Sequence, residues 1–268
     1  MMNMTDMVKQ LLIINIIFFI GSYLMPGLTD VLALRYFENE KFRLWQPITH
    51  MFMHGGLMHI FFNMFALVSF GSALEQMWGG KKFLFFYMSC GLGSALLHTG
   101  VSYYEVHDTL GYVAHLNLSS TEIQTFLNTD FSLLFGDNGK MLAGKAYSIL
   151  ERVDANQQDF EYLAKAAQLS RVSAVGASGA IYGLLVAFAF LFPNAELALM
   201  FIPMPIKAKY FVPGILLVDL FLGLKGDSLF GGGGTGVAHF AHIGGAICGF
   251  LIIWYWNKNQ FNKNRWDR

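Results

Sequence analysis

Six long apolar runs constrain the fold of this chain more than any other feature of its sequence. They cover about residues 8–27, 57–77, 83–101, 172–192, 210–224 and 237–256. A helix of about 20 apolar residues crosses the hydrocarbon core of a bilayer, where every backbone N–H and C=O needs an internal partner. Only 13% of the 268 residues are charged, whereas soluble domains carry about 25%. We therefore predict an all-α polytopic membrane protein, with six transmembrane helices in the lipid bilayer.

Charge and cysteine content narrow the possible partners. The chain has 18 basic and 18 acidic residues, and this zero net charge argues against a nucleic-acid partner. Cys90 and Cys248 both lie in apolar runs, so we expect no disulfide framework. The first apolar run lacks a small-residue cleavage site, so we expect it to be retained as a transmembrane helix.

Basic residues between the runs predict the orientation. With six transmembrane helices, two basic connections and the basic tail fall on one side of the membrane: Lys81, Lys82, Lys207, Lys209, Lys258, Lys263, Arg265 and Arg268. Such connections favour the cytoplasmic side. We expect an integral, multi-pass protein of the bacterial plasma (inner) membrane with both termini in the cytoplasm. Residues 28–56 would lie outside despite three basic residues, because acidic residues accompany them.

The segment at residues 102–171 differs sharply from the rest of the chain. It carries nine acidic and five basic residues, and about 70 residues are far too many for an ordinary connection. Ser119-Ser-Thr-Glu122 fits a capping box, in which each end residue's side chain bonds the other's backbone N–H. We predict a large, partly helical extramembrane insert between the third and fourth transmembrane helices, within a single membrane domain at residues 1–268.

Small residues at four-residue spacing mark two helix faces. Gly179 and Gly183 form one seam near the start of the fourth run, and Ala241, Gly245 and Gly249 form another in the sixth. Residues four apart share a helix face, and small side chains let two helix backbones approach closely. We expect these two helices to pack against each other along the seams.

Ser178 and His242 lie beside these seams. A histidine in an apolar span is costly to bury and indicates a functional site, and a serine needs an adjacent base to become a nucleophile. Most serines in membrane helices only pack, however. The two residues are also 64 positions apart, so the sequence alone leaves their contact open.

His59 and Asn63 lie four residues apart in the second run, on one helix face. Both can donate hydrogen bonds to a developing oxyanion. A metal site made by His50, His54 and His59 is the alternative. Their spacing is not that of the helical zinc-protease motif, and no glutamate base lies between them.

Asp219 lies in the fifth run, and an acid in a transmembrane helix invites a functional interpretation. It is near the outer end of that run, however, and there it would cap the helix or bind the following loop. We expect this structural role. The loop at residues 225–236 is rich in glycine and would let the fifth helix move relative to the sixth.

Three motifs, taken together, resemble the rhomboid family of intramembrane serine proteases. They are His54-Gly-Gly-Leu-Met-His59 with Asn63, Gly176-Ala-Ser-Gly179 with Tyr182, and Ala241-His-Ile-Gly-Gly245, and they occur in the family's order. The family often has Trp-Arg in the loop after its first helix, where this chain has Trp45-Gln46. That departure concerns the loop's anchoring contacts and not the chemistry.

The resemblance implies a rhomboid-like bundle of six helices and a serine-type endopeptidase that needs no metal or organic cofactor. Ser178 would attack the scissile carbonyl and His242 would take its proton, as a dyad without an acidic third member. Tyr182 would pack on the His242 ring, with Gly176 and Gly179 supporting the motif. The Ser178 amide would join His59 and Asn63 in stabilising the oxyanion.

The resemblance also implies the substrates, which would be membrane-spanning proteins cut in or near a helix that unwinds easily. A proteolytically inactive rhomboid-like protein that binds membrane proteins is the alternative, although such relatives usually lose the serine or the histidine. A transporter or channel would explain the spans and the intramembrane histidines, but not three ordered motifs.

Overall fold

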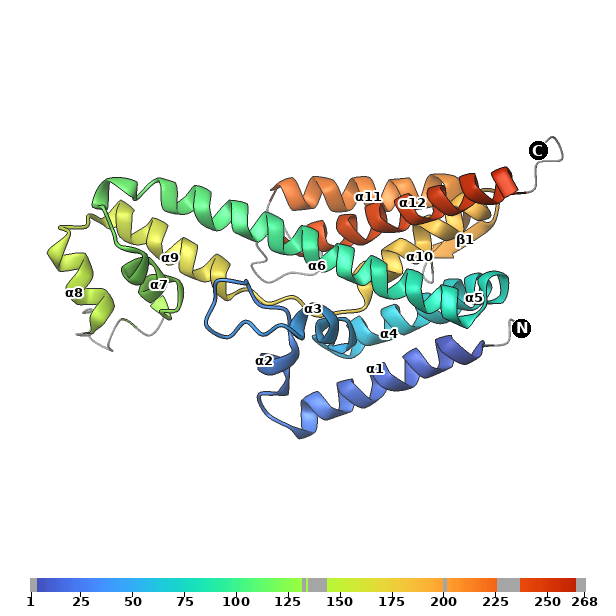
Figure 1. Ribbon diagram of the computed structural model, residues 1–268, viewed down its shortest axis with the longest axis horizontal. Helices are drawn as coiled ribbons and strands as arrows, with labels where there is room; N and C mark the ends of the chain where they lie inside the picture. The colour runs from blue at the N-terminus through green and yellow to red at the C-terminus, as the bar shows by residue number, and fades with distance from the viewer. Residues whose placement is uncertain (1–3, 132–133, 135–143, 200–201, 226–236, 264–268) are drawn as a thin grey trace. The chain divides into compact units, whose positions relative to one another are not determined.

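A computed structural model describes residues 4–131, 134, 144–199, 202–225 and 237–263 (Figure 1). Of the glycine-rich loop predicted at 225–236, residues 226–236 lie outside the described residues. The described elements are α1 (Asp6–Leu24), α2 (Leu28–Leu32), α3 (Gln46–Thr49), η1 (His50–Phe52), α4 (Leu57–Ala66), η2 (Leu67–Gly71), α5 (Ser72–Trp78), α6 (Gly80–Gly111), η3 (Ala114–Leu116), α7 (Ser120–Leu127), α8 (Lys145–Arg152), α9 (Gln157–Arg171), α10 (Ser178–Leu191), β1 (Glu196–Leu199), β2 (Ile202–Lys207), α11 (Ala208–Lys225) and α12 (Val237–Lys263).

The chain divides into two compact units. Unit 1 comprises residues 1–33, 47–98 and 175–268, and unit 2 comprises residues 34–46 and 99–174. Unit 2 includes the insert predicted at 102–171. The extramembrane position of that insert stays a prediction.

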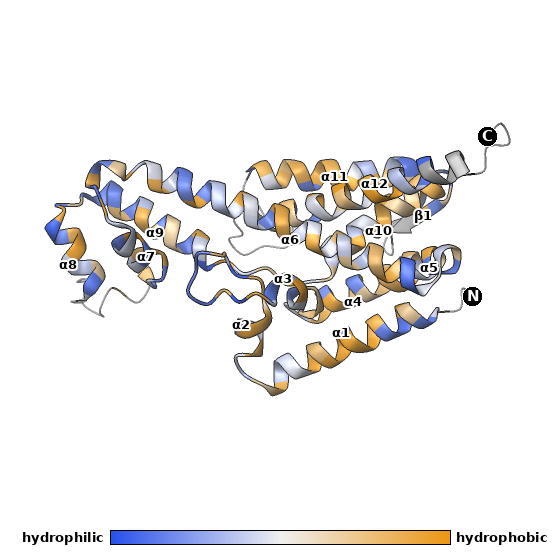
Figure 2. Cartoon of the chain, in the orientation of Figure 1, coloured by the Kyte–Doolittle hydropathy of each residue, from blue (hydrophilic) through white to orange (hydrophobic). Residues whose placement is uncertain are grey.

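Four described segments are long and apolar enough to cross a membrane. They are Asp6–Leu24, Leu57–Trp78, Gly80–Gly111 and His239–Lys258, and hydrophobic residues run along them in Figure 2. The apolar helix α10 has only 14 residues, and α11 carries Lys209, Asp219 and Lys225. The helices agree with the predicted all-α polytopic class, while the count of six transmembrane helices stays a prediction.

Unit 1 has a buried core that contains aromatic residues, and it also exposes apolar side chains on helix faces. Phe83, Phe86 and Tyr87 of α6 are fully buried in its core. On α1, by contrast, Ile17 and Ile20 are 60% and 50% exposed. An exposed apolar helix face is stable where hydrocarbon surrounds it, so this distribution is the one expected of a protein embedded in lipid.

The fourth apolar run becomes helical later than expected. The sequence indicates a helix from near Val172, but α10 begins at Ser178. Before it, Ala174 forms an antiparallel bridge with Leu34, and Gly176 adopts φ 127° while its N–H donates to the His50 carbonyl at 2.9 Å. The left-handed backbone at Gly176 interrupts the helix, and so Ser178 becomes the first helical residue.

Two further boundaries differ from the sequence prediction. The third helix does not end near Val101, since α6 continues to Gly111 and the predicted start of the insert lies inside it. The connection after α10 contains a short antiparallel hairpin, β1–β2, with Glu196 opposite Lys207 and Leu197 opposite Ile206. Neither strand was expected from the sequence.

The N-terminus of α1 is held by a buried carboxylate from α5. Glu75 accepts hydrogen bonds from the backbone N–H groups of Met7 at 3.0 Å and Val8 at 2.9 Å, and from the Thr5 hydroxyl. The first N–H groups of a helix have no partner within it, and the helix dipole favours an anion there. Glu75 therefore fixes the start of α1 against α5.

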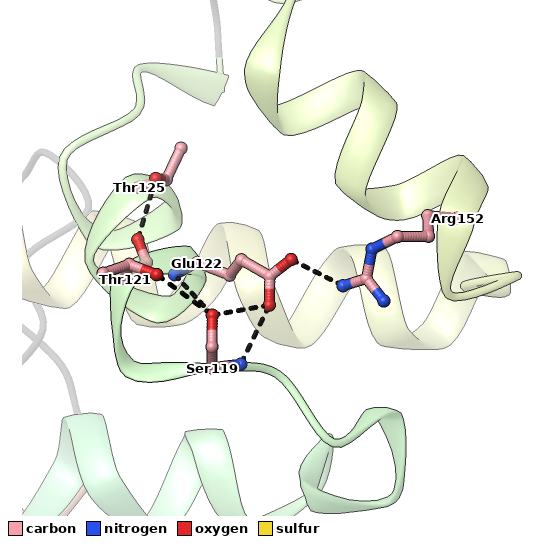
Figure 3. A network of polar contacts seen from close by, with 5 residues as sticks. All are labelled: Ser119, Thr121, Glu122, Thr125 and Arg152. Atoms are coloured by element: carbon pink, nitrogen blue, oxygen red, sulfur yellow. Dashed lines mark hydrogen bonds and ion pairs between the residues drawn. The ribbon is translucent and has the colours of Figure 1, made fainter.

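Unit 2 has its own core and well-capped helices. Val113, Phe126 and Leu163 are buried together in it. The predicted capping box is confirmed: the Glu122 N–H donates to Ser119 Oγ at 3.4 Å, and the Ser119 N–H donates to the Glu122 carboxylate at 2.9 Å. Arg152 of α8 pairs with the same carboxylate at 2.5 Å, which ties α8 to α7 (Figure 3).

Candidate active site

Ser178 stands at the N-terminus of α10. The preceding residue, Ala177, is the N-cap and provides no side-chain hydrogen bond to the helix. The amides of the first helical turn therefore have no partner within the helix, and they lie at the positive end of its dipole. The Ser178 hydroxyl therefore lies beside backbone N–H groups that can stabilise a negative charge.

Helices α10 and α12 meet along the two predicted seams of small residues. A Cβ added at Gly245 would lie 1.9 Å from the Gly179 carbonyl oxygen, and one added at Gly249 would lie 2.7 Å from the Gly183 Cα. Only glycine permits these contacts, because any side chain would overlap the other helix's backbone. The close approach brings residues near the seams, on different helices, within reach of each other.

The structure brings Ser178 and His242 into hydrogen-bond contact. Ser178 Oγ and His242 Nε2 are 2.9 Å apart. The Tyr182 ring stacks on the His242 ring with 4.3 Å between centroids and 8° between planes. Tyr182 lies one turn after Ser178 on α10, so a single helix carries both the hydroxyl and the ring that holds its imidazole partner.

Asp219 makes contacts that the sequence did not predict. We expected it to cap its helix or bind the following loop, and residues 226–236 of that loop lie outside the described residues. Asp219 lies inside α11, and its Oδ1 lies 3.3 Å from His242 Nδ1 and 2.5 Å from His239 Nδ1. Asp219 is 2% exposed. Two features of the sequence pointed to these contacts: an acid inside an apolar run, and two histidines three residues apart that share a helix face. The acid lies on α11 and the histidines lie on α12. These two helices pack side by side, as Figure 1 shows.

His59 faces the start of the serine motif. Its Nδ1 accepts a hydrogen bond from the Gly55 N–H at 3.2 Å, so in the neutral ring the proton sits on Nε2. A Cβ added at Gly176 would lie 2.8 Å from His59 Nε2 and 3.5 Å from Ser178 Oγ. Gly176 therefore leaves the space through which the His59 donor approaches Ser178.

Asn63 and His54 flank His59. Asn63 is buried, and its side-chain amide nitrogen donates to the His59 carbonyl at 2.7 Å. One of the two N–H groups of that amide is therefore bonded to the backbone of its own helix. His54 packs edge-on against His59 with 5.1 Å between ring centroids. Burial, helped by the nearby His59, lowers the pKa of His54 to about 4. His54 is therefore neutral at physiological pH and supports the His59 ring by packing.

One group of possible metal ligands occurs among the described residues, and it is not the predicted alternative of His50, His54 and His59. It comprises Asp219, His239 and His242, whose donor atoms lie within 4.8 Å of one another. Ligands of a tetrahedral zinc ion with bonds of about 2.0 Å lie about 3.3 Å apart. The 2.5 Å separation of His239 Nδ1 and Asp219 Oδ1 is that of a hydrogen bond instead.

Comparison with known proteins places this chain in a family. A family model for the rhomboid domain matches residues 41–115 and 127–259. Rhomboid protein 1, mitochondrial, of Saccharomyces cerevisiae is 26% identical over 208 residues, which are 77% of this chain and 40% of that protein. RHOMBOID-like protein 6, mitochondrial, of Arabidopsis thaliana is 41% identical over 59 residues, 22% of this chain and 18% of the plant protein.

A bacterial relative also matches. Rhomboid protease GluP of Bacillus subtilis is 36% identical over 52 residues, which are 19% of this chain and 10% of that protein. The chain spans less than half the length of each of these three relatives. Two of them are mitochondrial by name, so the comparisons do not support the bacterial plasma membrane expected from the sequence. The family match and the apolar helices make the chain an integral, multi-pass membrane protein. It belongs to the rhomboid family.

Proposed function

We propose that this chain is an intramembrane serine endopeptidase, which hydrolyses peptide bonds of membrane-spanning proteins in or near the bilayer. The observation that carries the proposal is the 2.9 Å contact between Ser178 Oγ and His242 Nε2. A serine hydroxyl is a weak nucleophile until an adjacent base removes its proton. The pair supplies both groups at hydrogen-bond distance, inside a site that the family match covers.

The reaction follows from this pair. As Ser178 Oγ attacks the scissile carbonyl carbon, its proton moves to His242 Nε2 and the carbonyl oxygen becomes an oxyanion. His242 then gives the proton to the leaving amine as the C–N bond breaks, leaving an acyl-enzyme. A water molecule, deprotonated by the same imidazole, attacks the ester and releases the carboxylic acid. Tyr182 keeps the His242 ring in one plane throughout, through the stacked contact.

Two hydrogen-bond donors, the His59 ring and the Ser178 backbone amide, would stabilise the oxyanion. His59 carries its proton on Nε2 when Gly55 donates to Nδ1, and that nitrogen lies at the Gly176 backbone, close to Ser178 Oγ. The Ser178 amide stands in the first turn of α10, where N–H groups lack helical partners. Fixed donors aimed at developing charge lower the barrier more than they stabilise the neutral substrate. Asn63 would contribute through the second N–H of its amide.

The proposed substrate class follows from the family and from the helix that carries Ser178. Membership of the rhomboid family and the position of Ser178 on the apolar helix α10 favour membrane-spanning segments as substrates. Such a segment must unwind locally, since a helical carbonyl is already hydrogen bonded and shielded. The Bacillus subtilis relative is named a rhomboid protease, which agrees with this chemistry.

Purified protein in detergent tests the proposal. We expect the wild-type protein to react with a fluorophosphonate probe and to cleave at least one protein of a single-span substrate panel. Ser178→Ala and His242→Ala should each abolish cleavage without loss of folded protein. Ser148→Ala, which changes an exposed serine of α8, is the matched control and should behave as wild type. Cleavage near the wild-type rate in either site variant would reject the mechanism, and an inert wild-type protein would favour the inactive, binding relative.

A further inference from the structure

Asp219 is a buried acid whose polar neighbours are the imidazoles of His239 and His242 and the hydroxyl of Tyr182. One carboxylate oxygen, Oδ1, receives the Nδ1 atoms of both His239 and His242, at 2.5 and 3.3 Å. A carboxylate oxygen can only accept, so each imidazole donates from Nδ1. His239 is itself buried, at 8% exposure. The carboxylate therefore bridges two residues of α12 from its place on α11.

Burying an acid in this helix carries a free-energy cost that an apolar residue would avoid. Isolated charges are strongly disfavoured away from water unless hydrogen bonds compensate, and ionisable residues in membrane segments generally mark function. Packing α11 against α12 requires no carboxylate, since Val212 fills the equivalent buried place two turns earlier on α11. We therefore look for the reason for this acid in the two histidines that it binds, His239 and His242.

The hydrogen bond from His242 to Asp219 selects the tautomer that catalysis needs. With the proton on Nδ1, the neutral ring presents the lone pair of Nε2 to Ser178 Oγ, 2.9 Å away. The opposite tautomer would direct an N–H at the hydroxyl and could not accept its proton. The partner of one ring nitrogen sets the state of the other. Tyr182 fixes the plane of the ring by stacking, but stacking does not distinguish between the two tautomers.

We propose that Asp219 is a positioning residue that extends the pair to a Ser178–His242–Asp219 triad, with His239 holding the carboxylate in place. This inference rests on the proposed function and departs from the dyad that the family resemblance implies. Asp219 stays ionised and stabilises the imidazolium that forms when His242 takes the serine proton. The 3.3 Å contact is long for such a bond, as catalytic hydrogen bonds often are without substrate, and it would shorten as the imidazole gains charge.

A purely structural role is the competing explanation. The shorter contact is between Asp219 and His239, so the acid would then only lock α11 to α12. The two explanations differ in which partner matters. Under the structural role, removing either side of the Asp219–His239 pair has the same effect. Under the positioning role, the loss of the carboxylate lowers turnover far more than the loss of the His239 imidazole.

The test compares Asp219→Asn with His239→Gln, and Asp108→Asn is the control because it changes an exposed acid of α6 in the same way. In a catalytic triad, replacing the aspartate by asparagine lowers kcat by about 10⁴-fold by favouring the wrong tautomer. Because Tyr182 also orients the ring, we expect a fall of about 10²- to 10⁴-fold for Asp219→Asn. KM and melting temperature should change little. His239→Gln keeps a donor for the carboxylate, so kcat should fall by no more than about tenfold, and Asp108→Asn should match wild type.

A second measurement decides the point without substrate. In protein labelled with ¹⁵N-histidine, the nitrogen shifts of His242, identified by their loss in His242→Gln, report which ring nitrogen carries the proton. We expect Nδ1–H in wild type and a shift toward Nε2–H in Asp219→Asn. This readout stands even if the wild-type protein proves inert toward substrates, an outcome that would reject only the proposed function. Unchanged kcat and tautomer in Asp219→Asn would overturn the inference. Equal losses of kcat and stability in Asp219→Asn and His239→Gln would also overturn it, in favour of the structural lock.

Discussion

At the scale of single residues, His59 and Asn63 share a helix face but differ in the hydrogen-bond donors that they can offer to an oxyanion. His59 Nδ1 accepts the Gly55 N–H, and its Nε2 is directed toward the Gly176 backbone near Ser178. One N–H of the Asn63 side-chain amide already donates to a backbone carbonyl of α4. An oxyanion donor acts mainly in the transition state, so its loss lowers kcat more than it raises KM. His59 is thus the stronger candidate of the two.

This difference predicts the order of two variants. Loss of one oxyanion donor typically lowers kcat by about 10²- to 10³-fold. We expect His59→Ala to approach that range and Asn63→Ala to lower kcat by about tenfold, with KM nearly unchanged in both. Measuring kcat and melting temperature on the same detergent preparations decides the matter. If both variants melt earlier while kcat per folded molecule is unchanged, the two residues serve only the structure.

The sequence predicted some residues of the candidate site and did not predict the contacts of Asp219, for a physical reason. Ser178 and His242 could be selected because each lies on a helix face marked by small residues at four-residue spacing. Asp219 could not be assigned, since its partners lie 20 and 23 positions away on another helix. Spacing shows which residues share a face of one helix. The register between α11 and α12 comes from their packing, which spacing does not encode.

At the scale of elements, the glycine contacts between α10 and α12 set the geometry of the site. The Gly245 Cα approaches the Gly179 carbonyl so closely that an added Cβ would lie 1.9 Å from the oxygen. The obstacle is backbone rather than a flexible side chain, so the only relief is to move the two helices apart. His242 lies one helical turn before Gly245, and it would move with its helix.

We therefore expect Gly245→Ala to separate Ser178 from His242 and to lower kcat by at least about 100-fold, together with a lower melting temperature. Gly214→Ala on α11 is the matched control, since nothing lies within 4 Å of its added Cβ. In an exposed helical position, alanine is favoured over glycine by roughly 0.5–1 kcal/mol, so this control should be as stable as wild type or more stable. A Gly245→Ala variant with wild-type activity would show that the close approach is not needed.

Element boundaries were harder to predict than element types. Hydropathy located the helical segments, because a bilayer demands apolar length. It could not locate the start of α10, because an apolar run extends through Val175 and Ala177, whereas the backbone at Gly176 is set by the His50 carbonyl and the His59 ring. This later start places Ser178 among the free amides of the first turn.

At the scale of the whole molecule, the two units differ in the side chains that they expose. Unit 1 exposes large aliphatic side chains such as Ile17 and Leu96, at 60% and 77%. Unit 2 contains capping boxes at Ser119 and Asn156, and surface ion pairs such as Arg152–Glu122. Capped, charged helices are typical of surfaces in water. This contrast in side chains supports the predicted extramembrane insert, and it leads to a topology that can be tested.

The topology prediction follows from the basic connections. If six helices cross the membrane, the connections with Lys81 and Lys207 and the tail after α12 share the positively charged side, and the 102–171 insert lies on the other. We expect an impermeant thiol reagent, added to the insert's side of sealed membranes, to label Ser148→Cys but not Asn262→Cys. Both would be placed in a background without Cys90 and Cys248, and disrupting the membrane should make Asn262→Cys reactive. The arrangement has three crossings between these positions, so labelling of both from one side of intact membranes would require an even number of crossings and would refute it.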